Sequence, residues 1–446
     1  MTQTMPPTPS STSSSTPQAS ESLNTPHMRR ILTSSFVGSA IEYYDFLLYA
    51  TAAALVFNKV FFVNLDPVWA TFASFGTLAA GYLARPVGGA IFGHYGDRLG
   101  RKKMLVLSML LMGFATTAMG LLPTAAAIGM AAPALLITLR VIQGIAVGGE
   151  WGGAMLIALE QAPGGKRGFA ASFANMGAPA GATLATLAMS AATLLPEEQF
   201  LSWGWRIPFL ISAVLVVIAM VIRLKISESP LFQQFEHEAD RRRMPILDVF
   251  TQYPKQLGLG VLAGIAQFTM AGMVTVWAVS EAVALGADKT GVLNAKAIAA
   301  AAMLIATIVS ARLCDRFGRR RIMLIGISSG IVAAYPILML VQTGTVAGYA
   351  TAVILGQVIQ GFMFGPLGAF IAEMFPTRVR YTGSSIAYQA SSTIGAGFTP
   401  MLAAGILAAT SGIAVLGGLW MAVLGVCALA VLLAPEGHRR QLADIR

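Results

Sequence analysis

Two stretches of the chain repeat one pattern: GHYGDRLGRKK at Gly93–Lys103 and ARLCDRFGRRR at Ala311–Arg321. Both contain Asp-Arg-x-Gly-Arg followed by two basic residues, and the two aspartates, Asp97 and Asp315, are 218 positions apart. Each copy is set between long apolar runs. The repeat therefore indicates two structural halves of like design, an arrangement typical of transporter folds.

A second set of repeated residues lies downstream of each copy. Val-Ile-Gln-Gly occurs twice, 217 positions apart, and Glu-x-x-Pro follows each time, at Glu160 and Glu373. Arginines come seven positions after these glutamates, at Arg167 and Arg380. Equivalent places at predicted helix ends favour ion pairs that stabilise a gate over ligand-binding groups.

The composition places the chain in a membrane. It is 56% hydrophobic and 11% charged, with a mean hydropathy of +0.69, whereas a soluble protein has roughly 25% charged residues. Spanning a hydrocarbon core of ~30 Å takes about 20 helical residues. Twelve runs qualify: 31–57, 68–93, 104–122, 134–160, 168–195, 204–224, 257–283, 293–314, 321–341, 347–374, 382–408 and 412–434. We therefore predict an all-α membrane protein of twelve transmembrane helices.

The basic residues predict the orientation. If alternate loops are assigned to opposite sides, one side holds only Lys59, Lys289 and Lys296, whereas nearly all other Lys and Arg fall on the other side. By the positive-inside rule the basic side, with both termini, is cytoplasmic. The net charge of +10 thus reflects topology, and no soluble basic domain indicates a nucleic-acid partner.

The polar segments predict no further domain. We expect a disordered cytoplasmic tail at 1–27, six-helix bundles at 28–225 and 257–436, a linker with a short amphipathic helix at 226–256, and a tail at 437–446. Two distant cysteines and four scattered histidines indicate neither disulfides nor a metal site. No cofactor and no nucleophile–base pair of an enzyme is expected.

At this point the residues resemble a known family. Two six-helix halves with the repeated loop resemble the major facilitator superfamily, over about residues 28 to 436. Five strings in order resemble its metabolite:proton symporter branch: GSAIEYYDFLLYA (Gly38–Ala50), RPVGGAIFGHYGDR (Arg85–Arg98), RVIQGIAVGGEWGGA (Arg140–Ala154), WGWRIPF (Trp203–Phe209) and SESPLF (Ser227–Phe232). That branch includes carriers of shikimate, 2-oxoglutarate, citrate, proline and betaine.

The resemblance implies a role for the repeated loop. In the family it is a charge-linked latch that holds the inner side shut in the outward-open state. The residues that match are Gly93, Asp97, Arg98, Gly100 and Arg101 in the first copy, and Asp315, Arg316, Gly318 and Arg319 in the second. A generic positive-inside loop is the alternative.

The first span carries two costly charges. Glu42 and Asp45 are three positions apart and hence neighbours on one helical face, and Tyr44 and Tyr49 add hydroxyls nearby. Buried carboxylates cost about 2.5–3.5 kcal/mol each on insertion scales, so we expect the pair to handle a proton or the substrate. The alternative is that either one only pairs with a basic residue to tie helices together.

The fourth span carries Arg140, Gln143 and Glu150 on nearby helical directions. Arg140 matches the Arg-x-x-Gln-Gly motif that the superfamily associates with proton coupling, and its counterpart in the second half is Gln357. A guanidinium facing a cavity is a natural carboxylate receptor. An ion pair of Arg140 with Glu150 or Glu42 is the alternative.

Other polar residues are weaker candidates. Arg85 is expected toward the inner end of span 2, where snorkelling can satisfy it, and Arg206 is expected to be structural. In the second half, Gln357, Gln360, Tyr388 and Gln389 can bind hydroxyls or a carboxylate, although polar residues at helix contacts often only hold helices together.

These features predict a proton-coupled symporter that takes up a small organic acid across the bacterial inner membrane, acting as a monomer with the proton as coupling ion. Three alternatives stay open: a proton-independent facilitator, a proline or betaine symporter, and a non-transporting sensor of the same fold. A betaine carrier would need an aromatic cage for the ammonium group, to which Tyr44, Tyr49 and Trp277 could contribute.

Overall fold

The computed structural model describes residues 25–65, 67–192, 194–224, 245–410 and 412–437, and these ranges contain helices and no strands. Most of the predicted tails and of the linker at 226–256, including the string SESPLF, lies outside the described residues.

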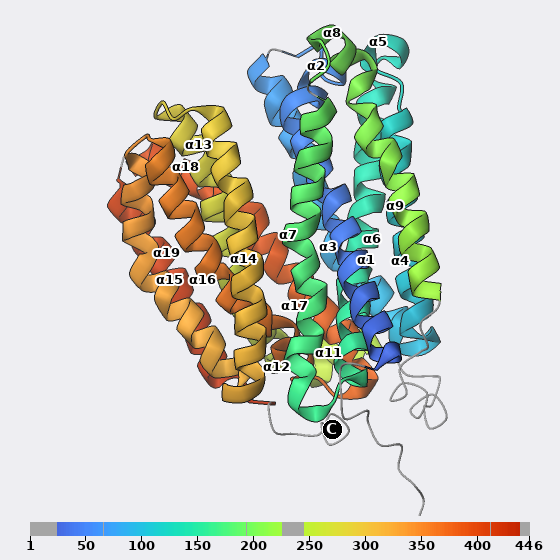
Figure 1. The fold of residues 1–446 in the computed structure, drawn as a ribbon, viewed down its shortest axis with the longest axis vertical. Coiled ribbons are helices and arrows are strands. Elements are labelled where there is room, and N and C mark those ends of the chain that lie inside the picture. Colours follow the sequence, from blue (N-terminus) through green and yellow to red (C-terminus); the bar gives the residue numbers. More distant parts are fainter. Residues whose placement is uncertain (1–24, 66, 193, 225–244, 411, 438–446) are drawn as a thin grey trace, which may run out of the picture.

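The first half forms one bundle. Its long helices are α1 (Pro26–Ala52), α3 (Pro67–Leu99), α4 (Arg101–Leu121), α6 (Ala131–Gln161), α7 (Arg167–Ala192) and α9 (Arg206–Leu224). A π-helical turn, η1 (Ala53–Phe57), extends α1. The short helices α2 (Asn58–Val60), α5 (Ala125–Ile128) and α8 (Glu197–Gln199) lie together at one end of this bundle, at the top right of Figure 1.

The second half forms the other bundle. It contains α12 (Pro254–Gly272), α14 (Lys289–Phe317), α15 (Arg319–Gln342), α16 (Val346–Ala372), α17 (Arg380–Ser392), α18 (Thr399–Thr410) and α19 (Ile413–Leu433). The π-helical turn η4 (Met273–Trp277) joins α12 to α13 (Ala278–Ala284), and η6 (Thr393–Phe398) joins α17 to α18.

Each predicted span coincides with one of these helical segments to within a few residues, so the predicted fold class is confirmed. Eight helices of the described chain are long and apolar enough to cross a membrane on length and composition alone. The segments built on α1, α3, α7 and α17 are not among them. Polar side chains occupy their interiors, and α1 and α3 carry the buried charges described below.

The two bundles meet at one end and diverge toward the other (Figure 1). The meeting end carries Asp97, at the end of α3, and Asp315, at the end of α14, and we call it the motif end. The first residues of α1 and the last residues of α19 also lie there (Figure 1). Across the interface α3 packs on α17, and α14 packs on α7.

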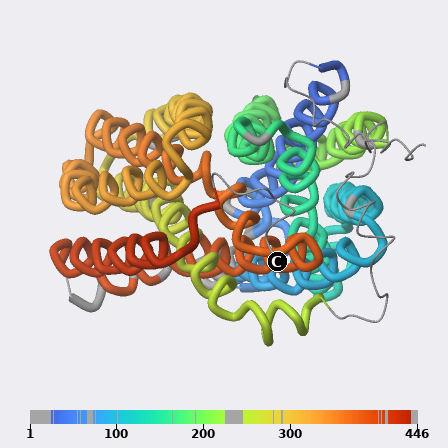
Figure 2. The backbone as a smooth tube through the Cα atoms, turned by 90° about the horizontal axis from the view of Figure 1, so that it is seen from below, coloured from blue at the N-terminus to red at the C-terminus, as the bar shows by residue number. Residues whose placement is uncertain are grey.

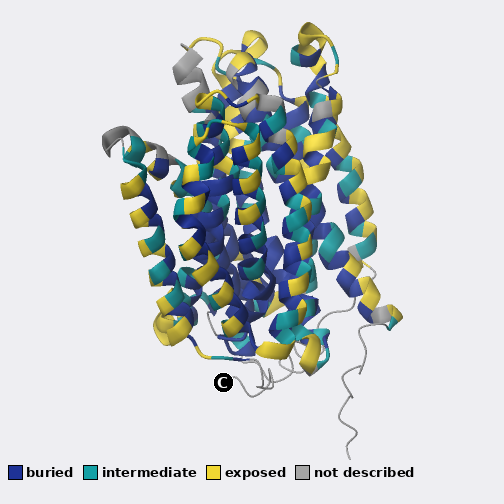
Figure 3. Ribbon diagram, turned by 60° about the vertical axis from the view of Figure 1, so that its left-hand side comes forward, coloured by how far each residue is buried: buried dark blue, intermediate teal, exposed yellow. Residues whose placement is uncertain are grey.

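The apolar core also joins the two bundles in one region and is separate in another. One large cluster includes residues of both bundles, such as Phe92, Trp151, Phe268 and Phe370. A second cluster, with Tyr49, Phe57, Trp205 and Phe209, belongs to the first bundle alone. Burial is concentrated along the inside of the molecule, whereas the outer helix faces expose large apolar side chains, as expected next to lipid (Figure 3).

A short helix of the predicted linker lies at the rim of the motif end. α11 (Pro245–Gln252) contacts α3 of the first bundle and α12 and α17 of the second, and it is seen from below in Figure 2. Pro245 and Val249 are buried, while Leu247 and Phe250 are about half exposed. The helix thus packs one apolar side on the protein and leaves other apolar side chains exposed, so the amphipathic helix predicted for this segment stays a prediction.

Candidate functional site

A network of buried side chains lies inside the first bundle. Asp45 of α1 accepts a hydrogen bond from the Ser212 hydroxyl of α9, with 2.6 Å between the oxygens, and interacts with the Thr116 side chain of α4. Gln143 Nε2 donates to Thr116 Oγ1 over 2.8 Å, and Arg140 Nη1 donates to Gln143 Oε1. Two neutral side chains, those of Thr116 and Gln143, thus lie between Asp45 and Arg140.

Arg140 is fully buried but only partly hydrogen-bonded. Its guanidinium carbon lies 4.1 Å from the ring centroid of Phe46 and 4.0 Å from that of Tyr49. Gly81 of α3 leaves room for it, since a Cβ there would collide with Arg140 Nε. Among the described residues, Nε and Nη2 have no hydrogen-bond partner. The contacts of Arg140 are therefore rings and one amide, without the carboxylate considered from the sequence.

Glu150 lies further along α6 and is also fully buried. It is close enough to Asp45 for their charges to interact. The sequence placed Glu150 on the same helical side as Arg140 and Gln143. The structure hydrogen-bonds those two residues to each other and places Glu150 near Asp45 instead.

Glu42 and Asp45 have different surroundings, although they are neighbours on α1. Glu42 is buried, and its charge acts on the hydroxyls of Tyr43 and Tyr388, which lie between the bundles. Asp45 lies inside the first bundle, against α9 and α4. The two carboxylates therefore belong to separate clusters.

Arg85 lies deeper than the sequence indicated. It is 5% exposed and near the middle of the 33-residue helix α3, where it cannot snorkel to the surface. Its guanidinium carbon is 3.9 Å from the Phe46 ring centroid and 4.7 Å from that of Tyr82. Phe46 therefore contacts both buried arginines of the first bundle.

Arg206 has the structural role expected for it. Its Nη1 donates to the carbonyl oxygens of Gly120 and Leu122, at 2.8 and 2.6 Å, and so satisfies the end of α4.

Tyr44, Tyr49 and Trp277 form no aromatic cage. The Tyr44 hydroxyl donates to the Pro208 carbonyl over 2.8 Å, and the Tyr49 hydroxyl donates to Thr77 over 2.6 Å. Both belong to the apolar cluster of the first bundle, while Trp277 lies in η4 of the second. The cage that the sequence left open is therefore not built from these residues.

A different aromatic group joins the bundles, and sequence reasoning missed two of its members, Tyr43 and Trp151. The hydroxyls of Tyr43 and Tyr388 are 3.0 Å apart. Tyr388 stacks on Trp151, with ring centroids 3.5 Å apart, and meets the edge of Phe268 at 5.0 Å. Trp151 Nε1 donates to Asn175 Oδ1. The adjacent tyrosines of Glu-Tyr-Tyr-Asp and the tryptophan among glycines were the available signals.

The second bundle offers amides instead of charges. Gln360 Nε2 donates to Gln267 Oε1 over 3.1 Å, and Gln267 was not predicted. In the described chain, Oε1 of Gln357 and Oε1 of Gln360 have no hydrogen-bond partner. Gln389 reaches across the interface, with Nε2 3.3 Å from the Gly148 carbonyl oxygen. The buried amides of α12 and α16 can thus hydrogen-bond a neutral polar group.

The two repeated aspartates each contact the other bundle. Asp97 accepts from the backbone N–H groups of Tyr381 and Thr382 at 3.3 and 2.9 Å, and from the Thr382 hydroxyl at 2.8 Å. Asp315 accepts from the N–H groups of Gly168 and Phe169, both at 2.8 Å. Each carboxylate therefore caps the first turn of a helix, α17 or α7, in the opposite bundle, where the helix dipole favours a negative charge.

The repeated glutamates also form contacts between the bundles. Arg380 Nη1 lies 3.0 Å from Glu160 Oε1, with both side chains buried. Arg319 Nη2 lies 3.1 Å from Glu373 Oε1 and 3.2 Å from Asp315 Oδ1, and the charge of Arg167 acts on Glu373. The Glu160–Arg380 pair joins α6 to α17, so the ion pairs predicted at this end connect one bundle with the other.

The remaining motif residues have varied surroundings. Arg98 lies 3.4 Å from His94 Nε2, Arg316 lies over the ring of Phe317, and the Arg101 side chain is outside the described part. Gly100 and Gly318 have φ of +107° and +97°, a conformation that favours glycine. A Cβ at Gly93 would collide with the backbone of Thr382. The repeated glycines, Gly100 and Gly318, are thus required by a turn, whereas Gly93, which matches Ala311 in the second copy, is required by a close helix approach.

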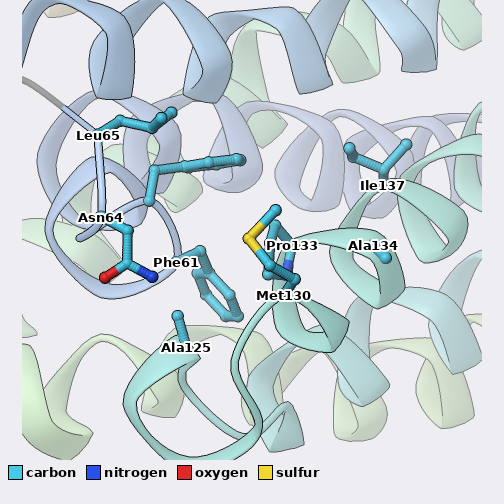
Figure 4. A pocket seen from close by; sticks show the side chains of 9 residues that line it. Phe61, Asn64, Leu65, Ala125, Met130, Pro133, Ala134 and Ile137 are labelled. Carbon is cyan, nitrogen blue, oxygen red and sulfur yellow. The ribbon is translucent and has the colours of Figure 1, made fainter.

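A pocket of about 280 Å³ lies at the opposite end of the first bundle, between the segment that follows α2, the start of α5 and the start of α6 (Figure 4). Its lining is apolar apart from Asn64: Phe61, Phe62, Asn64, Leu65, Ala125, Met130, Pro133, Ala134 and Ile137. No charged residue lines it, so it does not fit a charged ligand. Within the described ranges no cluster of His, Cys, Asp and Glu fits a metal ion.

Comparison with known proteins identifies the family. Residues 35–400 match the family model described as Major Facilitator Superfamily. The inner membrane metabolite transport protein YhjE of Escherichia coli (strain K12) is 39% identical over 421 residues, covering 93% of this chain and 95% of that protein. The shikimate transporter of the same organism is 39% identical over 384 residues, covering 85% and 88%.

More distant relatives agree with this result. A proline/betaine transporter of Salmonella typhimurium (strain LT2) is 33% identical, covering 84% of this chain and 77% of that protein. The proton:xylose symporter XylE bound to 6-bromo-6-deoxy-D-glucose has the same fold, with a TM-score of 0.77 at 17% identity, covering 94% of this chain and 98% of that one. The chain belongs to the major facilitator superfamily and is a secondary transporter, not an enzyme.

Proposed function

We propose that this transporter couples the uptake of a small organic acid to the inward movement of protons. The observation that carries the proposal is a cluster of polar side chains buried inside the first bundle: Gln143 hydrogen-bonds both Arg140 and Thr116, and Thr116 lies next to Asp45. A buried carboxylate and a buried guanidinium without a direct contact are costly. The cost is understandable if Asp45 is protonated and deprotonated during each transport cycle.

The substrate class follows from the charges. Arg85 and Arg140 are both buried next to Phe46, and a guanidinium binds a carboxylate through two parallel hydrogen bonds. The 39% identity to a shikimate transporter supports a monocarboxylate with hydroxyl groups. The amides of Gln267, Gln357 and Gln360 are suited to such hydroxyls.

The orientation is part of the proposal. The motif end carries most of the basic loop residues, so the positive-inside rule makes it cytoplasmic, with both termini on that side. The described conformation is then closed on the inside, held by the Asp97 and Asp315 caps and by the Glu160–Arg380 pair. Transport proceeds when these contacts break and the bundles rock to open the inside, as in alternating access. We expect a monomer in the bacterial inner membrane, with no cofactor besides the proton.

A zwitterionic osmolyte is the second candidate. The proline/betaine relative supports it, and the rings of Tyr43, Trp151, Phe268 and Tyr388 gather at the interface. A quaternary ammonium group binds to aromatic faces. Against this candidate, Trp151 and Tyr388 already cover each other's faces by stacking.

The test is uptake by proteoliposomes that contain the purified protein. Radiolabelled shikimate, 2-oxoglutarate, citrate, proline and betaine are offered with and without an inward proton gradient. The proposal predicts accumulation of at least one carboxylate, only with the gradient. Uptake of proline or betaine alone supports the second candidate. If the acid only reaches equal concentrations on both sides, with or without the proton gradient, the result supports a facilitator.

A further inference from the structure

We propose that Arg85 of α3 is the residue that binds the substrate carboxylate, while Arg140 remains in the network with Asp45. This inference rests on the proposed function, because it names the group that receives the anion. It divides two arginines that look alike in the sequence into two roles.

Arg85 is a buried cation that forms no ion pair with any described residue, although the charge of Glu42 acts on the same Tyr43 and Tyr388 hydroxyls. Its guanidinium contacts the rings of Phe46 and Tyr82, and Nε has no hydrogen-bond partner. Within the described part of the chain, Arg85 makes no ion pair and donates no hydrogen bond. Aromatic faces stabilise a cation, but they leave its N–H groups unsatisfied. A ligand carboxylate would satisfy two of them at once.

Arg85 also lies on the side of α3 that meets the second bundle. The Thr393 hydroxyl of the second bundle donates a hydrogen bond to the backbone carbonyl oxygen of Tyr82, at 2.9 Å. Gly89 packs on the backbone of Ser385, and Gly93 packs on Thr382. Positions 82, 85, 89 and 93 are spaced by three or four residues and so form one stripe on the helix. The charge of Arg85 accordingly acts on the hydroxyls of Tyr43 and Tyr388, between the bundles.

Arg140 lies on the inner side of the same bundle. It is enclosed by Gly81 of α3, the rings of Phe46 and Tyr49, and Gln143, which continues to Thr116 of α4. A substrate that enters between the two bundles therefore meets Arg85 before Arg140. Phe46 contacts both guanidinium groups and links the substrate position to the proton network.

Neighbouring groups complete a site for a hydroxylated acid. The Tyr43 and Tyr388 hydroxyls bind each other in this conformation and can instead bind a carboxylate or hydroxyl of the ligand. In the opposite bundle, Oε1 of Gln357 and Oε1 of Gln360 have no hydrogen-bond partner among the described residues and can accept from ligand hydroxyls. The first bundle would thus bind the acid group of the substrate, and the second bundle would bind its hydroxyl groups.

The experiment separates recognition of the ligand charge from transport. The assay measures how well an acid and its methyl ester compete with the labelled acid for binding to the purified protein in detergent. The pair is shikimate and methyl shikimate, or the acid that the wild type accumulates and its monomethyl ester. Hydrogen bonds to charged groups are worth about 1.5–3 kcal/mol, so the wild type is expected to prefer the acid about 10- to 150-fold. Arg85→Gln should reduce the acid/ester ratio, which is the affinity for the unlabelled acid divided by that for the unlabelled ester, to about one.

Two further variants serve as controls. Arg140→Gln should retain the acid/ester ratio while losing accumulation. Arg85→Lys, which keeps the charge but not the planar fork, should give an intermediate ratio. Because the ratio compares two ligands on one preparation, a uniform loss of folded protein does not change it.

The outcomes are distinguishable. If the wild type accumulates a carboxylate and folded Arg85→Gln keeps the full ratio, this inference is overturned and the proposed function stands. Loss of the ratio in Arg140→Gln but not in Arg85→Gln assigns the carboxylate to Arg140. If Arg85→Gln does not fold, an unchanged ratio in Arg85→Lys overturns the inference. If the wild type takes up no carboxylate, the proposed function itself fails.

Discussion

The two bundles derive from one repeated design, yet their interiors differ in charge. Away from the motif end, the first buries the charged residues Arg85, Arg140, Asp45, Glu42 and Glu150, whereas the second buries the amides Gln267, Gln357 and Gln360. The repeat pairs Arg140 with Gln357, and an offset of 218 pairs Asp45 with Ala263 and Arg85 with Met303. Since the second bundle folds without these charges, the fold does not require them in the first.

The motif end shows the opposite behaviour. There the two bundles use equivalent residues on each other: Asp97 caps α17 and Asp315 caps α7. Features that serve opening and closing are present in both halves, because both must detach together. The buried charges assigned to the proton and to the substrate carboxylate are present in one half only. The predictions below test this division.

The largest effect is expected from a substitution that makes the interior of the first bundle resemble that of the second. Arg140→Gln gives the first bundle the residue that the second has at the repeated position. A pH difference of one unit corresponds to about 1.4 kcal/mol per proton, so a one-proton symporter maintains an about tenfold substrate gradient in proteoliposomes. The variant should reach only equal concentrations inside and outside, measured with the membrane potential clamped. Gln357→Asn is the matched control, and accumulation that persists in Arg140→Gln would show that the charge asymmetry is not needed.

A second prediction tests the equivalence of the two caps. Asp97→Asn and Asp315→Asn each remove the charge at a helix N-terminus, worth about 0.3–2 kcal/mol, and each should shift the closed state toward opening by up to roughly 30-fold. The readout is labelling of Ser385→Cys, a fully buried position against Gly152, from the motif end in a variant without Cys314 and Cys427.

The control for this comparison is Asp288→Asn. Asp288 caps α14 by accepting from the Gly291 N–H over 2.6 Å, within its own bundle. Its loss should leave the labelling of Ser385→Cys unchanged. A response to only one of Asp97→Asn and Asp315→Asn would break the symmetry inferred for the motif end.

A smaller effect is expected in the second bundle. Gln360→Ala removes the hydrogen bond to Gln267, and a neutral hydrogen bond contributes about 0.5–1.5 kcal/mol. The KM for the transported acid should rise about two- to tenfold, while the gradient-driven accumulation ratio is unchanged. Loss of accumulation in Gln360→Ala would place coupling in both bundles and contradict the division drawn above.

The smallest effect is expected at the surface. Lys59 and Glu197 form an ion pair with N···O 2.9 Å, but their side chains are 51% and 74% exposed. Exposed pairs contribute little because water and salt screen them. Glu197→Gln should leave both the thermal unfolding temperature and uptake within experimental error of the wild type.

The sequence predicted the fold well, because long apolar runs, repeated glycines and basic loops are local signals. It also drew attention to Asp45 and Arg140, since a charge in an apolar run stands out, and to the motif residues, since they are repeated. It placed Arg85 near a helix end and missed Tyr43, Trp151 and Gln267. Their importance comes from contacts with residues far away in the chain. Such contacts depend on how helices rotate and pack.

The pairing at the motif end shows the same limit. The sequence indicated that Glu160 and Glu373 face arginines, but not that Arg380 would reach Glu160 in the other bundle. Sequence order cannot say which of two equivalent helix ends lies nearer. That information appears only when the two bundles are placed against each other.

The central claim is that Asp45 carries the coupled proton. The most direct measurement follows internal pH with a trapped dye while the transported acid is added outside proteoliposomes, in parallel with counterflow exchange of the labelled acid. The account predicts internal acidification with the wild type, and none with Asp45→Asn, although counterflow persists in the variant. Acidification by Asp45→Asn at the wild-type ratio of protons to substrate would contradict it.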